Sequence, residues 1–342
     1  MSSNYTQLRS NPRLDLVSAV PLPGPISVYL EVTNICNFKC VFCPESFDTY
    51  EEQAGGLFRS SDDDILAILD QLASLGTVKT LSFYMMGEPF VHKSLMDFVR
   101  HAKLKKAAQR LIVTSNGTLL LPKIFSSVVA SGLDYLRISI YGGTEERHRE
   151  RTQNNTPLAR IRQNVAAFRQ FRDQAGASTP FIYAKMIESQ DEEENNAFRK
   201  LFEGVADEVN VEPVMNWNDP REGNLAGIPQ QEMLATPYFA KRKNACPFPF
   251  YTMVIHSDLR VSVCCVDWSK QLIIGDLRKE SVSAVWAGEK LRNIQMTHLY
   301  GRRSELPGCA SCSYLYTAPD NIDALSPIEF ERRCQSSSGP QR

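Results

Sequence analysis

Three cysteines that lie close together constrain this chain more than any other feature of its sequence. They are Cys36, Cys40 and Cys43, and their spacing is C-x3-C-x2-C. A cubane [4Fe–4S] cluster takes four thiolate ligands, and a loop this short supplies only three of them. One iron would therefore be able to bind a molecule that is not protein. The spacing predicts an iron–sulfur site with one open iron, held on a single loop.

Two simpler interpretations of this loop are weighed against that one. Three close cysteines could bind structural zinc, or they could be buried thiols that bind nothing. Structural zinc takes a fourth ligand, and no His or Cys follows Cys43 until His92. We therefore favour the iron–sulfur interpretation.

Segments typical of strands alternate with segments typical of amphipathic helices from residue 26 to about residue 214. The expected strands cover residues 26–33, 78–84, 109–115, 135–141, 181–187 and 208–214. The expected helices cover residues 61–75, 93–106, 122–131, 157–171 and 192–202. Six such units with right-handed crossovers make an open parallel barrel rather than a closed one of eight strands. The sequence predicts an α/β fold, a partial (β/α)6 TIM-like barrel, with the cysteine loop at the C-terminal end of the first strand.

The length and charge of the chain limit its class. Its 342 residues exceed the usual size of one core, so we expect a large α/β domain and a smaller one. Lys and Arg number 38 against 39 Asp and Glu, which gives no electrostatic reason to expect nucleic acid or a membrane surface as a partner. The sequence shows no signal peptide and no apolar run of about 18 residues, so we expect a cytoplasmic protein. The nine cysteines, grouped in metal-ligand spacings, do not indicate disulfides.

A second group of cysteines lies in the C-terminal third of the chain. Cys246, Cys264, Cys309 and Cys312 provide four thiolates, enough to complete a cubane with no open iron. Zinc is the alternative, because four thiolates with one C-x2-C pair also form a zinc-ribbon pattern. Residues 251–256 and 260–265 predict a hairpin and residues 281–299 a helix, a module too small to have much core of its own. We expect a second [4Fe–4S] cluster here, used for electron transfer or for structure.

Cys265 is left over beside Cys264. It could be a buried spare thiol, or it could be the ligand with Cys264 as the spare. A third interpretation makes Cys265 catalytic, as a thiol near the substrate that donates a hydrogen atom to a carbon radical.

The first loop and the strands after it resemble the radical S-adenosylmethionine (radical SAM) superfamily. The resemblance implies that S-adenosylmethionine chelates the open iron through its amino and carboxylate groups and is cleaved to a 5′-deoxyadenosyl radical. It also implies cofactor-binding roles: near the adenine for Phe42, on the methionine amino group for Gly87 and Glu88, and elsewhere along the cofactor for Asn116 and Ser139. Met86 stands where the family usually has a first glycine. Taken alone, Gly-Glu-Pro and Asn-Gly are ordinary turn signals.

Three charged residues are weaker candidates. Arg151, which follows a Gly-Gly turn, could clamp the cofactor carboxylate through a bidentate contact. Lys185 and Glu212, on the fifth and sixth expected strands, point toward possible substrate space. Each could equally lie on the surface, because the phase of a strand cannot be fixed from one sequence.

The second cysteine group resembles the SPASM/twitch auxiliary-cluster domains of the same superfamily, found in aminocyclitol dehydrogenases and sugar epimerases of antibiotic pathways. The resemblance implies two [4Fe–4S] clusters, S-adenosylmethionine, and an electron donor such as flavodoxin or ferredoxin. We expect an N-terminal extension over residues 1–25, the barrel over residues 26–225, the auxiliary domain over residues 226–330 and a disordered tail over residues 331–342.

The resemblance implies an enzyme that oxidises or epimerises a sugar, an aminocyclitol or a nucleoside. A radical at an alcohol carbon gives a ketone if it loses an electron and a proton, and gives the epimer if Cys265 returns a hydrogen atom from the opposite face. One alternative is radical decarboxylation of a sugar acid, with Arg137, Arg151 or Lys185 on its carboxylate. Another is modification of a ribosomal peptide, which the few Pro-rich residues before the first strand do not favour. The alternative that is not an enzyme is an iron–sulfur or zinc scaffold, which would need no cofactor pocket.

Overall fold

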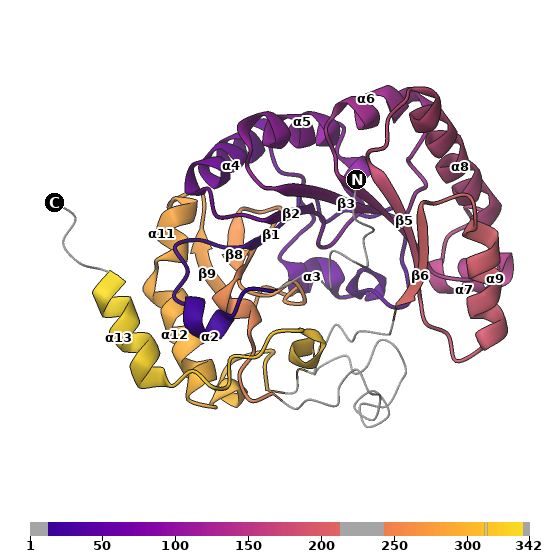
Figure 1. Ribbon diagram of the computed structural model, residues 1–342. Helices are drawn as coiled ribbons and strands as arrows, with labels where there is room; N and C mark the ends of the chain where they lie inside the picture. Colours follow the sequence, from indigo (N-terminus) through magenta and orange to yellow (C-terminus); the bar gives the residue numbers. More distant parts are fainter. Residues whose placement is uncertain (1–12, 213–242, 311, 313, 338–342) are drawn as a thin grey trace.

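Nine strands form one continuous sheet in the computed structural model, which describes residues 13–212, 243–310, 312 and 314–337. Their order across the sheet is β6-β5-β4-β3-β2-β1-β7-β8-β9. The first six run parallel, each beside the next, and are β1 (Ser27–Leu30), β2 (Thr80–Phe83), β3 (Arg110–Ser115), β4 (Tyr135–Ile140), β5 (Phe181–Ile187) and β6 (Glu208–Glu212). Figure 1 shows them curving inside an arc of helices without closing. The predicted α/β fold with a partial six-stranded barrel is confirmed.

Helices cover the outer face of this barrel (Figure 1), and they are α4 (Asp62–Leu75), α5 (Leu95–Lys105), α6 (Phe125–Ala130), α8 (Leu158–Gln174) and α9 (Glu192–Phe202). Helix α4 illustrates why such a segment folds. The Ser61 hydroxyl accepts a hydrogen bond from the Asp64 backbone N–H and caps the first turn. Its apolar residues at helical spacing, among them Ile65 and Leu72, are buried against the sheet. All five expected helices are present.

Two further helices lie near the first cysteine loop and were not expected. Helix α3 (Tyr50–Ala54) follows the loop, and α7 (Glu145–Thr152) follows β4. The sequence of α7 is almost entirely charged, and only His148 and Thr152 in it are buried, so it has no apolar stripe to detect. Its N-cap is a residue type that the sequence does show: the Thr144 hydroxyl accepts a hydrogen bond from the Arg147 N–H, and threonine is a common N-cap.

The C-terminal part extends the barrel sheet instead of forming a separate one. Strand β7 (Thr252–Ile255) pairs parallel with β1, and β8 (Arg260–Ser262) and β9 (Ile273–Asp276) continue antiparallel. The predicted hairpin is β7 and β8. The single helix predicted over residues 281–299 is wrong, because the chain forms α11 (Val282–Trp286) and α12 (Glu289–Leu299). Gly288 takes an extended backbone conformation between them and is the N-cap of α12.

The two ends of the described chain pack together. Helix α2 (Leu16–Ala19) and helix α13 (Pro327–Ser337) share a buried cluster in which Leu16 and Phe330 lie with Phe250. Arg333 donates to the Val17 carbonyl at 2.7 Å, and Figure 1 shows α13 (yellow) beside α12. The prediction of disorder is therefore wrong for residues 331–337, because the buried side chains of Phe330 and Cys334 hold the helix in place. Residues 338–342 and the predicted boundary at residues 225 and 226 lie outside the described residues.

In the described residues, no helix combines the length and the apolar character that crossing a membrane requires.

Candidate active site

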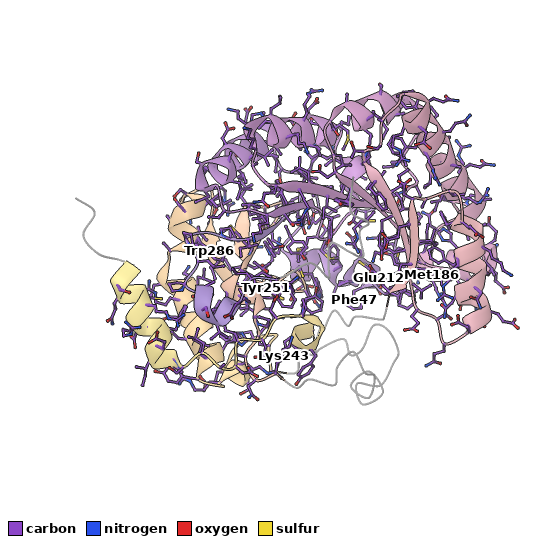
Figure 2. The ribbon with its side chains drawn as sticks, viewed as in Figure 1. Phe47, Met186, Glu212, Lys243, Tyr251 and Trp286 are labelled. Atoms are coloured by element: carbon purple, nitrogen blue, oxygen red, sulfur yellow. The ribbon has the colours of Figure 1, made fainter. Side chains whose placement is uncertain are left out.

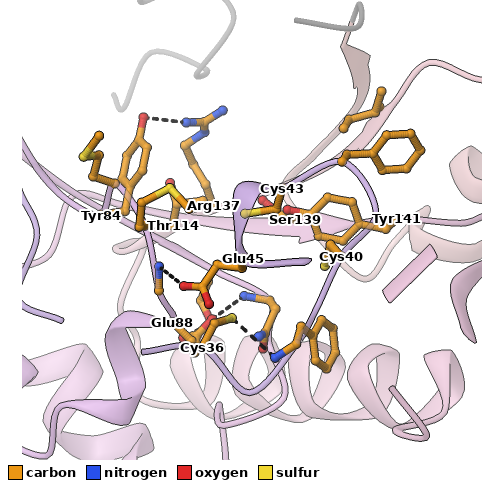
Figure 3. A pocket seen from close by; sticks show the side chains of 18 of the residues that line it. Cys36, Cys40, Cys43, Glu45, Tyr84, Glu88, Thr114, Arg137, Ser139 and Tyr141 are labelled. Atoms are coloured by element: carbon orange, nitrogen blue, oxygen red, sulfur yellow. Dashed lines mark hydrogen bonds between the residues drawn. The ribbon is translucent and has the colours of Figure 1, made fainter. Parts of the chain in front are cut away.

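The first cysteine loop lies at the C-terminal end of β1 and lines a cavity of about 220 Å³ (Figure 3). Cys36, Cys40 and Cys43 all line this cavity. The backbone N–H of Lys39 donates to the carbonyl of Thr152 at 3.1 Å, and that of Val41 donates to the carbonyl of Arg151 at 2.8 Å. The C-terminal end of α7 therefore fixes the loop, which gives this unpredicted helix a structural role.

The chemistry of the three thiols fits a metal cluster. Burial raises the pKa of Cys36 to about 12, and it also raises the pKa values of Cys40 and Cys43. Such thiols become thiolates only when a cation takes the place of the proton. Within the described residues, no three His, Cys, Asp or Glu side chains are arranged to hold a single metal ion. Three thiolates in the wall of this cavity would leave one iron of a cubane open toward it.

Glu88 is buried beneath the cysteine loop and is held by three donors. Its carboxylate accepts hydrogen bonds from the Ser115 hydroxyl at 2.8 Å, the Asn116 backbone N–H at 2.7 Å and the Phe90 backbone N–H at 3.1 Å. Burial raises the pKa of Glu88 to about 7, and these hydrogen bonds oppose the rise. The carboxylate lines the cavity beside Cys36 (Figure 3).

Glu45 is a buried residue of the cavity that the sequence analysis missed. It follows the third cysteine by two positions and accepts hydrogen bonds from the Gly87 backbone N–H at 3.1 Å and from the Lys39 ammonium at 3.2 Å. Burial raises the pKa of Glu45 to about 7. A carboxylate this near a predicted cluster was the available signal, although nothing in the sequence shows that it turns inward.

The other predicted cofactor residues meet in the same cavity with one exception. Phe42, Gly87, Asn116 and Ser139 line it, and the Phe42 ring stacks near Tyr141 with 6.4 Å between centroids. Arg151 instead forms a bidentate ion pair with Glu194 of α9, at 2.7 and 2.9 Å.

The expected cofactor clamp is therefore replaced by a structural contact. The Arg151 guanidinium lies 5.7 Å from the centre of the Phe42 ring, so it can support the ring from behind. Arg151 pairs with Glu194 because the Glu194 carboxylate is buried, at 4% exposed, and a buried carboxylate requires a cation beside it.

Charged and phenolic side chains line the cavity near the ends of β4, β5 and β6. Glu212 lies 3.3 Å from the Lys185 ammonium and 3.4 Å from the Arg137 guanidinium, and it accepts a hydrogen bond from the Tyr183 hydroxyl at 2.9 Å. Arg137 also donates to the Tyr84 hydroxyl at 3.0 Å (Figure 3). Figure 2 shows Glu212 at the end of β6, close to Met186 of β5.

The sequence left open which face of the sheet these side chains occupy, and the strand pairing answers this question. Arg137 pairs with Tyr183 in the sheet, and Ser139 pairs with Lys185. Alternate residues of a strand share a face, so these positions all point to the inside of the barrel. Lys185 and Glu212 line the cavity, which was one of the two placements that the sequence left open.

Cys265 lines the same cavity as the first cysteine loop. Its thiol donates a hydrogen bond to the Tyr314 hydroxyl at 3.3 Å, and it packs in a buried cluster with Met85 and Trp268. Burial raises its pKa, so the sulfur keeps its hydrogen at neutral pH. Cys265 is therefore a protonated thiol facing the space in which a ligand of the first loop would lie.

Cys264 faces a second, much smaller cavity of about 40 Å³ together with Cys246, Cys309 and Cys312. The structure thus places Cys264, and not Cys265, with the other three cysteines, and the role of Cys264 as the ligand stays a prediction. Burial raises the pKa values of Cys246, Cys264 and Cys309, to about 12 for Cys309, so this donor set also fits a metal cluster. The first cavity is the larger of the two, at about 220 Å³ against about 40 Å³.

The two cavities share a wall. Val266 and Tyr314 line both of them. The Tyr314 ring stacks on Phe248 at 4.9 Å between centroids, which holds it between the two cysteine sets. His298 and Arg303 also line the second cavity, and the sequence analysis missed both.

Sequence comparisons match both of the regions that contain the cysteine sets. Residues 30–184 match the radical SAM superfamily, and residues 246–313 match SPASM, an iron–sulfur cluster-binding domain. The chain belongs to the radical SAM superfamily. It is a radical SAM enzyme with a SPASM domain, and these two domains imply S-adenosylmethionine and [4Fe–4S] clusters as its cofactors.

Curated relatives of this radical SAM enzyme have several activities. The 2-deoxy-scyllo-inosamine dehydrogenase of Niallia circulans, which depends on S-adenosyl-L-methionine, is 21% identical over 290 residues, 84% of this chain and 92% of that protein. The tungsten-containing aldehyde ferredoxin oxidoreductase cofactor-modifying protein of Pyrococcus furiosus is 28% identical over 165 residues, 47% of this chain. The AdoMet-dependent heme synthase of Methanosarcina barkeri is 32% identical over 125 residues, 36% of this chain. The matched region spans only 43% and 34% of the latter two proteins.

Solved structures share the fold of this radical SAM enzyme. BtrN in complex with AdoMet and 2-DOIA superimposes with a TM-score of 0.55 and 17% identity, covering 88% of this chain and 97% of that one. Streptococcus suis SuiB bound to precursor peptide SuiA gives a TM-score of 0.61 and 15% identity, covering 91% and 76%. At these identities the likeness concerns the fold alone.

Proposed function

We propose that this radical SAM enzyme oxidises or epimerises a small hydroxylated molecule, namely a sugar, an aminocyclitol or a nucleoside. The adjacent pair Cys264 and Cys265 carries the proposal, because Cys265 brings a thiol to the cavity of the first cysteine loop, for epimerisation, and Cys264 lines the second cavity next to it, where a cluster could accept an electron, for oxidation. When bound, the first cluster and S-adenosylmethionine together supply a 5′-deoxyadenosyl radical, which removes a hydrogen atom from the substrate. A second cluster on Cys246, Cys264, Cys309 and Cys312 would supply one-electron transfer.

Residues at the cluster end of the cavity would bind and orient S-adenosylmethionine. Three donors already hold the Glu88 carboxylate, and its remaining lone pair can accept a hydrogen from the methionine amino group. The Phe42 ring, supported by Arg151 and Tyr141, offers an apolar face to the adenine. Asn116 and Ser139 are our candidates for the ribose and the rest of the cofactor.

Charged residues of the cavity on β4, β5 and β6 would bind the substrate. Glu212 can accept hydrogen bonds from hydroxyl or amino groups, and Lys185 and Arg137 can donate them. This mixture of charged donors and acceptors suits a polar ring with several hydroxyl groups, because every substrate hydroxyl buried here needs a partner.

The position of Cys265 allows a choice between two outcomes from the same substrate radical. In epimerisation, the Cys265 S–H bond breaks, its hydrogen atom forms the new C–H bond on the opposite face, and a thiyl radical is left for one-electron reduction and protonation. In dehydrogenation, the alcohol radical loses its hydroxyl proton and one electron to give a ketone, and Cys265 takes no part.

The Cys265→Ala variant tests this choice. The reconstituted enzyme would be incubated in D2O with dithionite, S-adenosylmethionine and a panel of sugars, aminocyclitols and nucleosides, and its products analysed by mass spectrometry. Because a thiol exchanges with solvent, epimerisation should leave one deuterium at the inverted carbon. We expect Cys265→Ala to lose that product and to keep forming 5′-deoxyadenosine.

Cys334→Ala is the matched control, because Cys334 is a buried cysteine in the α13 cluster. It should behave like the unmodified protein. A ketone that forms equally well in Cys265→Ala would assign the protein as a dehydrogenase. Failure of the fully loaded protein to form any 5′-deoxyadenosine would overturn the proposed radical chemistry itself.

Radical decarboxylation of a sugar acid is a second candidate, favoured by two cationic side chains in the cavity wall. Arg137 and Lys185 could hold a carboxylate before it leaves. Sugar acids in the same panel would reveal this reaction as release of CO2 from a labelled carboxyl group.

A further inference from the structure

His298 lies between two of the cysteines that line the second cavity. It belongs to α12, whose buried face also includes Leu291, Ile294 and Gln295. These residues recur at helical spacing, so His298 is directed inward by the same stripe that packs the helix. Its side chain is 1% exposed and lines the second cavity with the four cysteines.

Both ring nitrogens of His298 face a cysteine of this set. The backbone N–H of Cys246 lies 3.4 Å from Nδ1, and the Cys309 sulfur lies 4.0 Å from Nε2. A backbone N–H can only donate, so Nδ1 must be the acceptor and carries no proton. The neutral imidazole then has its single proton on Nε2, the atom that faces the sulfur of Cys309. The tautomer is assigned in this way from the hydrogen-bond network.

Neighbouring residues already anchor this part of the chain. Arg303 donates to the carbonyl oxygens of Cys309 at 2.6 Å and Cys312 at 3.1 Å. Gln295 donates to the carbonyl of Pro249 at 2.9 Å and ties α12 to the turn after Cys246. These contacts hold backbone carbonyl groups in place, whereas the Nε2–H group of His298 is directed at the sulfur of Cys309.

We propose that His298 donates an N–H···S hydrogen bond to the Cys309 sulfur and thereby raises the reduction potential of the cluster held by this cysteine set. The proposal rests on the auxiliary cluster of the proposed function. Reduction adds a negative charge that is shared by the ligand sulfurs, so a donor aimed at one of them stabilises the reduced form more than the oxidised form. His298 is thus a positioning residue that acts through the cluster.

The reduction potential of the auxiliary cluster affects how readily it exchanges an electron during the reaction. The auxiliary cluster must accept an electron if the substrate is oxidised, or give one if a Cys265 thiyl radical is reduced. A raised potential makes acceptance easier. Removal of the Nε2–H donor should therefore lower the ability of the enzyme to take an electron from a substrate radical.

The test is a redox titration of the full-length protein followed by EPR. Cys36, Cys40 and Cys43 are replaced by Ala, so that only the auxiliary cluster contributes to the signal. In this background His298→Phe, which has no donor, is compared with His298→Gln, which keeps an amide N–H. His101→Phe, a change in α5 on the outside of the barrel, is the control.

We expect His298→Phe to lower the equilibrium constant for reduction roughly tenfold, which is about 59 mV for a one-electron couple. His298→Gln should shift the potential less, and His101→Phe should not shift it. An unchanged potential in His298→Phe, with the iron and sulfide of one cluster per chain, would overturn the proposal. If the Phe variant does not fold, His298→Met is the second variant without a donor and is judged in the same way.

Iron analysis separates this proposal from the one on which it rests. If the triple-alanine protein with His298 intact binds no cluster, the assignment of Cys246, Cys264, Cys309 and Cys312 as ligands fails. If it binds a cluster whose potential does not respond to His298→Phe, only the role of His298 fails.

Discussion

At the scale of single residues, Gly87 stands at a position in the candidate active site that has no room for a side chain. Its φ is +75°, and a Cβ at this position would lie 2.4 Å from the carbonyl oxygen of Thr33. The backbone after β2 therefore passes directly against the backbone after β1. This close approach lets the Gly87 N–H reach Glu45 and places Glu88 beneath the cysteine loop.

Gly87→Ala should combine backbone strain with a clash against backbone atoms. We expect a loss of more than about 2 kcal/mol in the free energy of unfolding, measured by chemical denaturation, together with weaker binding of S-adenosylmethionine. Gly76→Ala is the matched control, since its φ is +66° and nothing lies within 4 Å of the added methyl group. It should lose only about 1 kcal/mol. Equal losses in the two variants would show that the contact with Thr33 is unimportant.

At the scale of elements, α13 illustrates how a polar segment can belong to the core. Most of its residues are charged or polar, yet Phe330 is fully buried and packs edge-on against Phe250 at 5.6 Å between ring centroids. Phe250 lies in the turn that follows Cys246. The last helix described therefore supports the segment that carries the first cysteine of the second set.

Phe330→Ala should destabilise the protein by about 3 to 5 kcal/mol, because it leaves a cavity where an aromatic ring was fully buried. Ile328→Ala, in the same helix, is the control, because Ile328 is 76% exposed. It should change the free energy of unfolding by less than about 0.5 kcal/mol. Both values come from denaturant unfolding. A small loss in Phe330→Ala would mean that α13 does not contribute to the folded core.

At the scale of the whole molecule, one of the junctions between the barrel and the SPASM region lies at the ends of β1 and β7. Strand β7 lies beside β1, and Glu31, just after β1, accepts hydrogen bonds from the Ser257 hydroxyl at 2.7 Å and from the Met86 backbone N–H at 3.2 Å. His256 is buried at the same junction, and its Nε2 lies 2.9 Å from the Ser262 hydroxyl. Burial lowers the pKa of His256 to about 4.

The stability of the molecule should therefore fall in acid through His256. The unfolded chain takes up a proton near the ordinary pKa of 6.5, whereas folded His256 does so only near 4, so its contribution is present above pH 6.5 and is lost as the pH falls toward 4. The full loss is about 3 kcal/mol.

The His256→Gln variant should lack this part of the pH dependence, as measured by urea unfolding at a series of pH values. Glu45 and Glu88, whose pKa values are raised, act in the opposite direction, but they are the same in both proteins. The difference between the two curves thus isolates His256. Parallel curves for the two proteins between pH 6.5 and 4 would contradict the expectation.

The parts of this protein that could be predicted from its sequence depend on neighbours along the chain. The motif of Cys36, Cys40 and Cys43 could be recognised because all three ligands lie on one short loop. The six strands and five of the helices could be predicted because their apolar residues recur along the chain at the period of a strand or a helix. Their order then implies the parallel sheet, and a parallel sheet gathers Gly87, Glu88, Asn116 and Ser139 at one end.

Only the tertiary structure decided which side chains meet across that framework. It paired Arg151 with Glu194, turned Glu45 inward, and set β7 beside β1. It also sent Cys264 and Cys265 into different cavities and brought His298 to Cys309. These contacts join residues that are distant in sequence or depend on where a side chain points, and no local period encodes either. Burial selects them, because every charge and thiol removed from water must find its partner within the fold.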